Sequence, residues 1–309
     1  MGKKKNWPLW IGLFFVCLLL CIAVLGPIIA PYDLKYNAGV HTEVVNGTST
    51  LIAPPIEPFK DARYIFGTDR WGYDLWTMLL YGAKYTIFTA VIVAMVKTAA
   101  GALLGFTMGL RAKQPLWWVT FEEIWGYLPG FLIIYFILLP ITINPTVPPF
   151  QLTALFTGAA ILIGIPSMTA SIREKTIQLK TEAFMEASIV LGSSKARLMI
   201  KHIIPHFREE LLMLFILEIV HTLTMMGQLA LFNLFIGGTI YQPDSKLYIS
   251  ITKEWAGLIG QARPYLYWGE KYMLLIPLCF LLFAIVSFHI LGIGVQKHFH
   301  QSYTKNSWY

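Results

Sequence analysis

Charged residues are scarce in this sequence. Only 13% of its 309 residues are Asp, Glu, Lys or Arg, whereas 56% are hydrophobic. Soluble domains usually carry about 25% charged and roughly 45–50% apolar residues. The composition therefore excludes an ordinary soluble domain and predicts an integral membrane protein.

Cysteine is scarce as well. Cys17, Cys21 and Cys279 all lie in apolar runs, where a thiol behaves as a small hydrophobic group, so neither a disulfide framework nor a cysteine metal site is expected. His202 and His206 have a workable ligand spacing, but a proline intervenes and no further ligand completes a set. We therefore predict no metal site.

Motifs for nucleotide binding are missing. The sequence contains no GxxxxGK(S/T) loop and no GxGxxG after a strand. Partner subunits would have to bind any ATP and Mg, and we expect no cofactor on this chain. Neither a metal cluster nor a convincing nucleophile and base pair is evident, so no catalytic residue is predicted and an enzyme is not expected.

The formal net charge is +7, which raises the question of nucleic acid binding. In a membrane protein a basic excess usually marks the cytoplasmic loops and the leaflet that they face. We therefore expect the lipid bilayer, and no nucleic acid, as a partner.

Long apolar runs dominate what is present. A hydrocarbon core of roughly 30 Å requires about 20 apolar residues in a helix that rises about 1.5 Å per residue. Six segments meet this requirement, which predicts an all-α membrane protein with six transmembrane helices, at approximately Leu9–Ala30, Thr86–Leu110, Phe121–Ile143, Phe150–Ile172, Phe207–Phe235 and Tyr272–Val295.

The distribution of Lys and Arg indicates the orientation. Lys3, Lys4 and Lys5 precede the first span, and Arg111 and Lys113 follow the second, whereas the short connection at 144–149 has no basic residue. The positive-inside rule then places both termini in the cytoplasm. We expect a cytoplasmic terminus and first span at 1–30, an outer loop at 31–85, a five-span domain at 86–296 with a cytoplasmic loop at about 173–206, and a cytoplasmic tail at 297–309.

The end of the outer loop has helical periodicity. Trp71, Leu75, Met78 and Leu79 recur at helical spacing, with Asp74 on another face. The pattern predicts an amphipathic helix that lies along the outer membrane interface.

Polar and small residues inside the spans indicate protein contacts. Gly101, Gly105 and Gly109 share one helical face, which favours close packing either within the chain or against another subunit. Charged groups within or beside the spans are expected to face protein or water because they are costly in lipid; these are Lys97, Glu218 and His221, with Glu122 and Glu123 at the start of span three.

The basic stretch from Glu182 to His206 interrupts the apolar pattern. Glu182 to Leu191 reads as a short amphipathic helix that Gly192 ends, because glycine adopts the backbone conformation common at helix ends. Ser193 or Ser194 can cap a second helix. We expect Pro205 to break that helix where span five begins.

The same stretch resembles the EAA motif of ABC-importer membrane subunits. The motif positions are held by Glu186, Ala187, Ser188, Gly192, His202, Ile204 and Pro205. In that family the loop forms a coupling helix that fits a groove on a cytoplasmic ATPase and transmits its closure to the spans. The resemblance implies that Glu182 belongs to the same coupling element.

The amino-terminal part is similar to the C-type permease subunits of dipeptide, oligopeptide and nickel importers. GPIIAPYD begins at Gly26, and FGTDRWGYDLWTMLLYGAKYTI begins at Phe66. The sequence departs from the family pattern at Tyr73, Lys84 and Ile293, which leaves the identity of the cargo open.

The resemblance implies a type I importer permease in a bacterial-type cell membrane. It further implies a homologous second permease subunit, two cytoplasmic ATPases and an extracellular solute-binding protein as partners. Peptide is the expected cargo, with nickel or another small solute as the alternative. Glu218 and His221 would line the translocation path, and the outer docking surface would include Asp69, Arg70, Asp74 and Trp255. An ion channel or an intramembrane enzyme is the alternative from another class.

Overall fold

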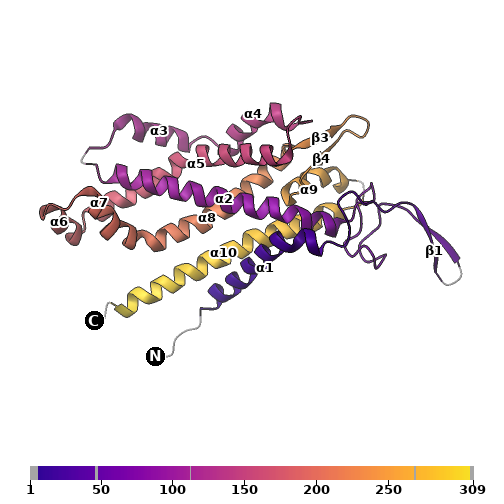
Figure 1. Ribbon diagram of the computed structural model, residues 1–309, viewed down its shortest axis with the longest axis horizontal. Coiled ribbons are helices and arrows are strands. Elements are labelled where there is room, and N and C mark those ends of the chain that lie inside the picture. The colour runs from indigo at the N-terminus through magenta and orange to yellow at the C-terminus, as the bar shows by residue number, and fades with distance from the viewer. Residues whose placement is uncertain (1–5, 46–47, 112, 268, 307–309) are drawn as a thin grey trace.

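The computed structural model describes residues 6–45, 48–111, 113–267 and 269–306, and it is mostly helical, as predicted (Figure 1). Two antiparallel strand pairs, β1 with β2 and β3 with β4, interrupt the helices in this part of the chain. The elements in chain order are α1 (Trp7–Ile29), β1 (His41–Val45), β2 (Thr48–Ile52), α2 (Leu75–Gly109), α3 (Leu116–Gly126), α4 (Gly130–Thr142), α5 (Pro149–Lys180), α6 (Ala183–Val190), α7 (Lys195–Leu198), the π-helical segment η1 (Met199–Ile203), α8 (Ile204–Leu231), β3 (Thr239–Gln242), β4 (Leu247–Ser250), α9 (Trp255–Ala262), the 3-10 helix η2 (Arg263–Leu266) and α10 (Tyr272–Asn306).

Among the described residues, five helices are long and apolar enough to cross a membrane, and a bent pair brings the number to six if it counts as one span. The bent pair is α3 with α4, which meet at 81°. The expectation of one continuous helix from Phe121 to Ile143 is therefore wrong. Pro129, the residue before α4, has no N–H to continue the hydrogen-bond ladder of α3, which explains the break.

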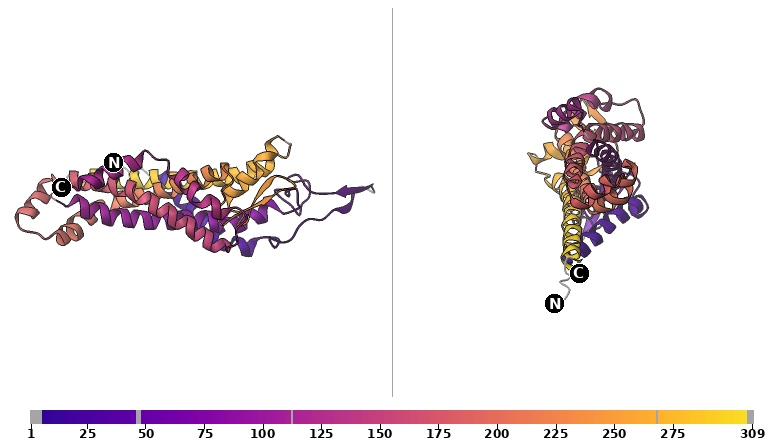
Figure 2. Two further views of the ribbon diagram at one scale, coloured as in Figure 1. Left: turned by 90° about the horizontal axis from the view of Figure 1, so that it is seen from above. Right: turned by 90° about the vertical axis from the view of Figure 1, so that its left-hand side faces the viewer.

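The long helices α1, α2, α5, α8 and α10 run along the length of an elongated bundle (Figures 1 and 2). Helix α2 packs against α1, α5 and α8, and α1 also lies against α10. Glycines permit the closest crossings: a Cβ atom on Gly12 would lie 2.5 Å from the backbone of Leu291, and one on Gly26 would lie 2.4 Å from that of Leu80. Small residues thus bring helix backbones together where lipid provides no hydrophobic drive.

The predicted interfacial helix is not a separate element. Leu75, Met78 and Leu79 belong to the first turns of α2, and each is at most 2% exposed. The predicted helical spacing is confirmed, but the helix continues without a break into the predicted second span. The apolar face is covered by the protein itself and does not lie in the interface.

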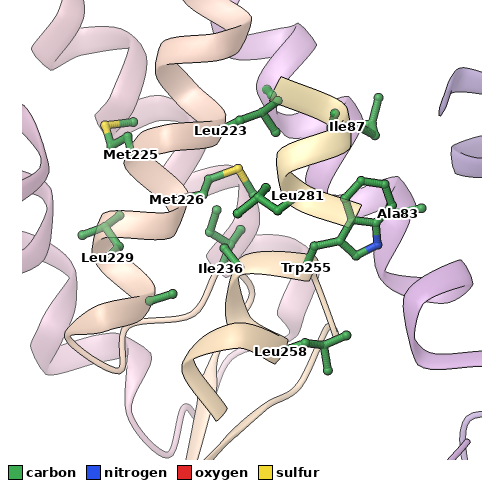
Figure 3. Close-up of a cluster of buried hydrophobic side chains, with 14 of the residues drawn as sticks. Ala83, Ile87, Leu223, Met225, Met226, Leu229, Ile236, Trp255, Leu258 and Leu281 are labelled. Atoms are coloured by element: carbon green, nitrogen blue, oxygen red, sulfur yellow. The ribbon is translucent and has the colours of Figure 1, made fainter. Parts of the chain in front are cut away.

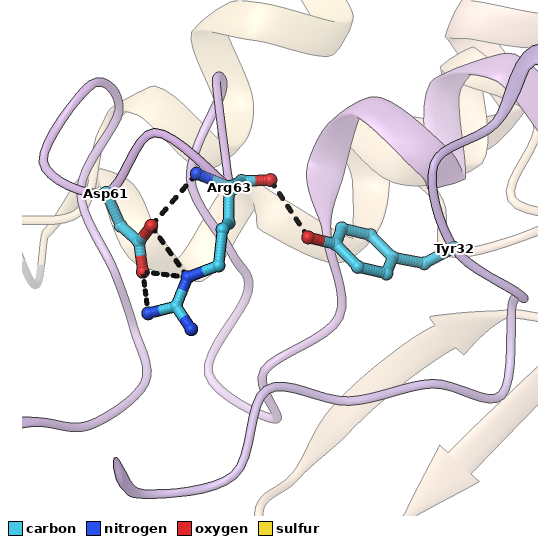
Figure 4. Close-up of polar contacts among 3 residues, drawn as sticks. All are labelled: Tyr32, Asp61 and Arg63. Carbon is cyan, nitrogen blue, oxygen red and sulfur yellow. Dashed lines mark hydrogen bonds and ion pairs between the residues drawn. The ribbon is translucent and has the colours of Figure 1, made fainter. Parts of the chain in front are cut away.

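Before α2, the outer segment is held together by polar contacts. The Arg63 side chain donates to Asp61 Oδ2 over 2.7 Å, and the Tyr32 hydroxyl donates to the carbonyl of Arg63 over 3.2 Å (Figure 4). The bond from Tyr32 joins the chain that leaves α1 to the chain that approaches α2, and the bond to Asp61 fixes the Arg63 side chain locally.

Both ends of the described chain lie at the same end of the bundle as α6 and α7, and β1 and β2 project from the opposite end (Figure 1). This arrangement agrees with the expectation that the termini and the basic loop share one side of the membrane. The cytoplasmic side stays a prediction from the distribution of Lys and Arg, of which Lys3, Lys4 and Lys5 lie outside the described residues.

Candidate functional site

The basic loop forms two helices with a glycine between them. Helix α6 ends at Val190, and Gly192, two residues later, has a φ of +76°. Ser193 N–H donates to the Ser188 carbonyl, five residues back, over 3.1 Å. This bond and the positive φ are the features of a glycine-terminated helix. The Ser194 hydroxyl accepts from Arg197 N–H at the start of α7, so Ser194 is the cap that the sequence left undecided.

Helix α6 presents most of its surface to solvent in this chain. Met185 is fully buried and anchors it, whereas Glu186 and Ala187 are exposed. At its carboxyl end, Val190 and Leu191 are 86% and 85% exposed. An apolar tip of this size on a short helix is typical of a surface that a partner protein covers.

Aromatic contacts join α6 to the helix that follows. The ring of Phe184 lies 5.9 Å from the ring of His206 and 6.4 Å from that of His202. His202, which the family resemblance selected, thus takes part in holding α6 against η1 and α8. The two histidines meet an aromatic ring, and the described residues contain no group of three or more His, Cys, Asp or Glu arranged to hold a metal ion.

Pro205 does not break the helix as expected. Residues Lys195–Leu231 form one helical unit, and Pro205 is the second residue of α8. The π-helical segment η1 precedes it, and Ile204 N–H donates to the Met199 carbonyl, five residues back. This wider turn accommodates the proline, which has no N–H of its own and would crowd a regular turn.

The charged residues inside the spans form an ion pair between α2 and α8. Lys97 Nζ lies 2.6 Å from Glu218 Oε2, and His221 Nδ1 lies 3.8 Å from the same oxygen. The Lys97 side chain passes over α5 at Gly164, where a Cβ atom would lie 2.1 Å from Lys97 Cε. Sequence reasoning located these groups but did not pair Lys97 with Glu218, although opposite charges in neighbouring spans are the signal for such a pair.

A cavity of about 320 Å³ lies beside this ion pair, where α3 and α4 meet. It is bounded by α2, α5, α8 and the break between α3 and α4. Its lining includes Lys97, Trp125, Pro129, Gly164, Glu218 and His221.

A second buried ion pair lies near the same helix break. Arg173 Nε donates to Glu122 Oε2 over 3.0 Å, and both side chains are at most 8% exposed. Glu123, the other acidic residue noted from the sequence, is exposed. This pair fixes α3 to α5, so the bent segment is attached to the bundle at its amino-terminal half.

Gly101, Gly105 and Gly109 pack within the chain. Cβ atoms at these positions would lie 2.3, 2.8 and 2.5 Å from Met168, Ile172 and Thr176 of α5, respectively. Of the two alternatives, intrachain packing is therefore the one that the structure supports.

The expected outer docking surface is wrong at three of its four residues, because they are buried. Trp255 is 0% exposed and donates through Nε1 to the Leu79 carbonyl over 2.9 Å. Figure 3 shows its ring among apolar side chains that include Ala83 and Ile87. In the sequence Trp255 follows two charged residues, Lys253 and Glu254, which is typical of a segment at a membrane interface. In the fold its indole ring nevertheless packs in the core.

The two aspartates of that prediction stabilise turns. Asp74 accepts hydrogen bonds from the Thr77 N–H and hydroxyl and caps α2. Asp69 accepts from Trp71 N–H and Tyr73 N–H. Burial raises the pKa of Asp69 to about 6, against the lowering effect of the hydrogen bond from Tyr73 N–H and of the Lys253 charge. Arg70 alone remains partly exposed, 3.5 Å from Glu270.

The comparisons with known proteins agree with this architecture. Residues 98–305 match the family described as binding-protein-dependent transport system inner membrane component, and residues 4–46 match the N-terminal TM domain of oligopeptide transport permease C.

Three relatives illustrate the similarity. The chain is 24% identical to the dipeptide transport system permease protein DppC of Bacillus subtilis over 295 residues, which cover 95% of this chain and 81% of the relative. It is 25% identical to DppC of Haemophilus influenzae, with 95% and 90% covered. It is 27% identical to the oligopeptide transport system permease protein OppC of B. subtilis, with 66% and 60% covered. The chain therefore belongs to the family of binding-protein-dependent transport system inner membrane components, multi-pass membrane proteins with the type I importer permease fold.

Proposed function

We propose that the protein is a membrane-spanning subunit of an ATP-driven importer for peptides. The dipeptide and oligopeptide permeases among its relatives support peptide as the cargo. In this proposal the chain itself is not an enzyme. It forms half of a translocation path, and a homologous second permease subunit forms the other half.

The continuous helical unit Lys195–Leu231 carries this proposal. Near one end of this unit, His206 contacts Phe184 of the exposed helix α6. Further along, Glu218 of the same unit lines the cavity. At about 1.5 Å per residue, roughly 35 Å separate Lys195 from Glu218 along the helix axis. A push on α6 can reach the cavity through one stiff element.

The energy would come from partner subunits. Two cytoplasmic ATPases would bind ATP and Mg, and their closure would move α6 as a rigid body, which is a known way of switching packed helices. The exposed side chains of Glu186 and Ala187, with the apolar tip at Val190 and Leu191, form the surface that an ATPase would hold. An extracellular solute-binding protein would deliver the cargo at the opposite end.

Replacement of Glu186 by Lys tests this assignment. Glu186 is exposed, so we expect Glu186→Lys to leave folding intact while it removes the ATPases from the purified complex and abolishes uptake. Glu57→Lys makes the same charge change at an exposed site near the other end and should retain the ATPases. Normal ATPase retention and uptake in Glu186→Lys would contradict the proposal.

A further inference from the structure

The geometry points to a binding subsite for a primary ammonium group, such as the free amino terminus of a peptide, in the cavity beside Glu218. This inference rests on the proposed function and assigns a chemical class to the ligand of the path. It follows from how the charged groups that line the cavity are paired with one another.

Lys97 lines the cavity, but Glu218 already pairs with its ammonium group. Its side chain is 7% exposed and is confined by Gly164, and its Nζ donates to Glu218 Oε2 over 2.6 Å. A buried cation with this partner is already neutralised, because separating the pair would leave a charge unpaired in a medium of low dielectric. An incoming anion therefore does not find a free cation here.

The open edge of the ion pair includes the carboxylate, which only accepts hydrogen bonds. The Glu218 side chain is 18% exposed and that of His221 is 65% exposed, so the carboxylate and the imidazole, which is 3.8 Å from it, form the open edge of the ion pair. A carboxylate has two oxygens and about four lone-pair sites, and one bond to Lys97 does not exhaust them. An ammonium group placed at this edge would gain a charge-assisted hydrogen bond.

The rest of the cavity suits the same ligand. Trp125 lines it, and its Nε1 is directed to the Ile163 carbonyl over 2.8 Å, which fixes the indole. The face of an indole ring attracts cations. The volume of about 320 Å³ is close to the lower end of the range for small-molecule sites, roughly 300–1,000 Å³, so one end of a peptide fits rather than a long chain.

Thiol labelling at position 221 tests the charge preference. The variant His221→Cys would be made in the intact transport complex with Cys17, Cys21 and Cys279 replaced by Ala. Its reaction rate would be measured with a cationic aminoethyl and an anionic sulfonatoethyl methanethiosulfonate, each normalised to free cysteine in solution. We expect at least a tenfold normalised preference for the cationic reagent, and loss of that preference when Lys97→Gln and Glu218→Gln are added together.

Protection by small peptides tests the ligand class in the same variant. Dialanine should slow the labelling, and N-acetyl-dialanine, which lacks the ammonium group, should not. Equal normalised rates of the two reagents, or equal protection by the two peptides, would overturn the inference. If the complex imports peptides but shows equal rates, this inference fails and the proposed function stands. If labelling shows the preference but import is absent, the proposed function fails instead.

Discussion

Gly105 lies where α2 crosses α5, and the contact leaves no room for a side chain. In Gly105→Ala the new Cβ atom would lie 2.8 Å from Ile172 Cβ, so we expect a loss of stability of about 1–3 kcal/mol from overpacking. Gly158→Ala on α5 is the matched control, because its Cβ atom would meet no atom within 4 Å. The control should be neutral or gain up to about 1 kcal/mol from helix propensity. Thermal unfolding in detergent measures both, and equal stability of the two variants would contradict the packing account.

The buried carboxyl of Glu254 should make the stability of the fold depend on pH. Its carboxyl is fully buried before α9, and burial raises its pKa to about 8, although hydrogen bonds from backbone N–H groups, that of Ile236 first, act in the opposite direction. Between the ordinary pKa of 4.5 and about 8, the folded state keeps a proton that the unfolded state releases. Stability should therefore fall as pH rises through this window, by at most about 1.4 kcal/mol per pH unit, and level off above it.

The variant Glu254→Gln isolates this contribution. It should flatten the decline of the melting temperature between pH 6 and pH 8.5, because an amide does not titrate. Glu57→Gln, a change at an exposed site, should retain the decline of the parent protein. A parent protein whose melting temperature rises over this range would show that the sign is wrong.

Residue types were easier to predict than residue environments. The sequence identified Lys97 and Glu218 as costly charges within spans, since lipid makes such residues rare, but their pairing depends on how α2 and α8 meet. Asp69, Asp74 and Trp255 were expected at a docking surface because they lie in the predicted outer segments. Long-range packing of α9 against α2 buries Trp255, and no local pattern in the sequence reports that packing.

At the scale of elements, periodicity predicted most helices but not where one helix breaks or continues into the next. The short helix before Gly192 was correct, because a glycine end is a local signal. The break at Pro129 was missed, because the hydrophobicity of Phe121 to Ile143 is continuous across it. At Pro205 a break was predicted that does not occur. The wider turn of the π-helical segment η1 accommodates the proline, and the helix continues.

The stiffness of the joined helix Lys195–Leu231 can be tested at η1. Ile200 and Lys201 are exposed, so replacing both by Gly should weaken the helix by about 1 kcal/mol per residue relative to Ala without disturbing the core. We expect the Gly pair to lower the number of peptides imported per ATP hydrolysed, and the Ala pair to leave it unchanged. Equal transport stoichiometry in the two variants would mean that α8 does not transmit the motion.

At the scale of the whole molecule, the described ends and α6 share one end of the bundle (Figure 1). If the ATPases bind α6, both termini must then be cytoplasmic. A fluorescent protein fused to the carboxyl terminus should therefore be bright, and alkaline phosphatase fused there should be inactive. An active phosphatase would reverse the orientation and exclude α6 as a contact for cytoplasmic ATPases.

The central claim is that peptide movement through this chain is driven by ATP. The most direct measurement is accumulation of labelled dipeptide in proteoliposomes that contain the whole complex, with solute-binding protein at the outer face and ATP at the α6 face. The account predicts accumulation above the external concentration with ATP, and none with a non-hydrolysable analogue or with Glu186→Lys in this chain. Equilibration of the dipeptide without ATP would indicate a channel, and ATP-driven accumulation of nickel but of no peptide would contradict the assigned cargo.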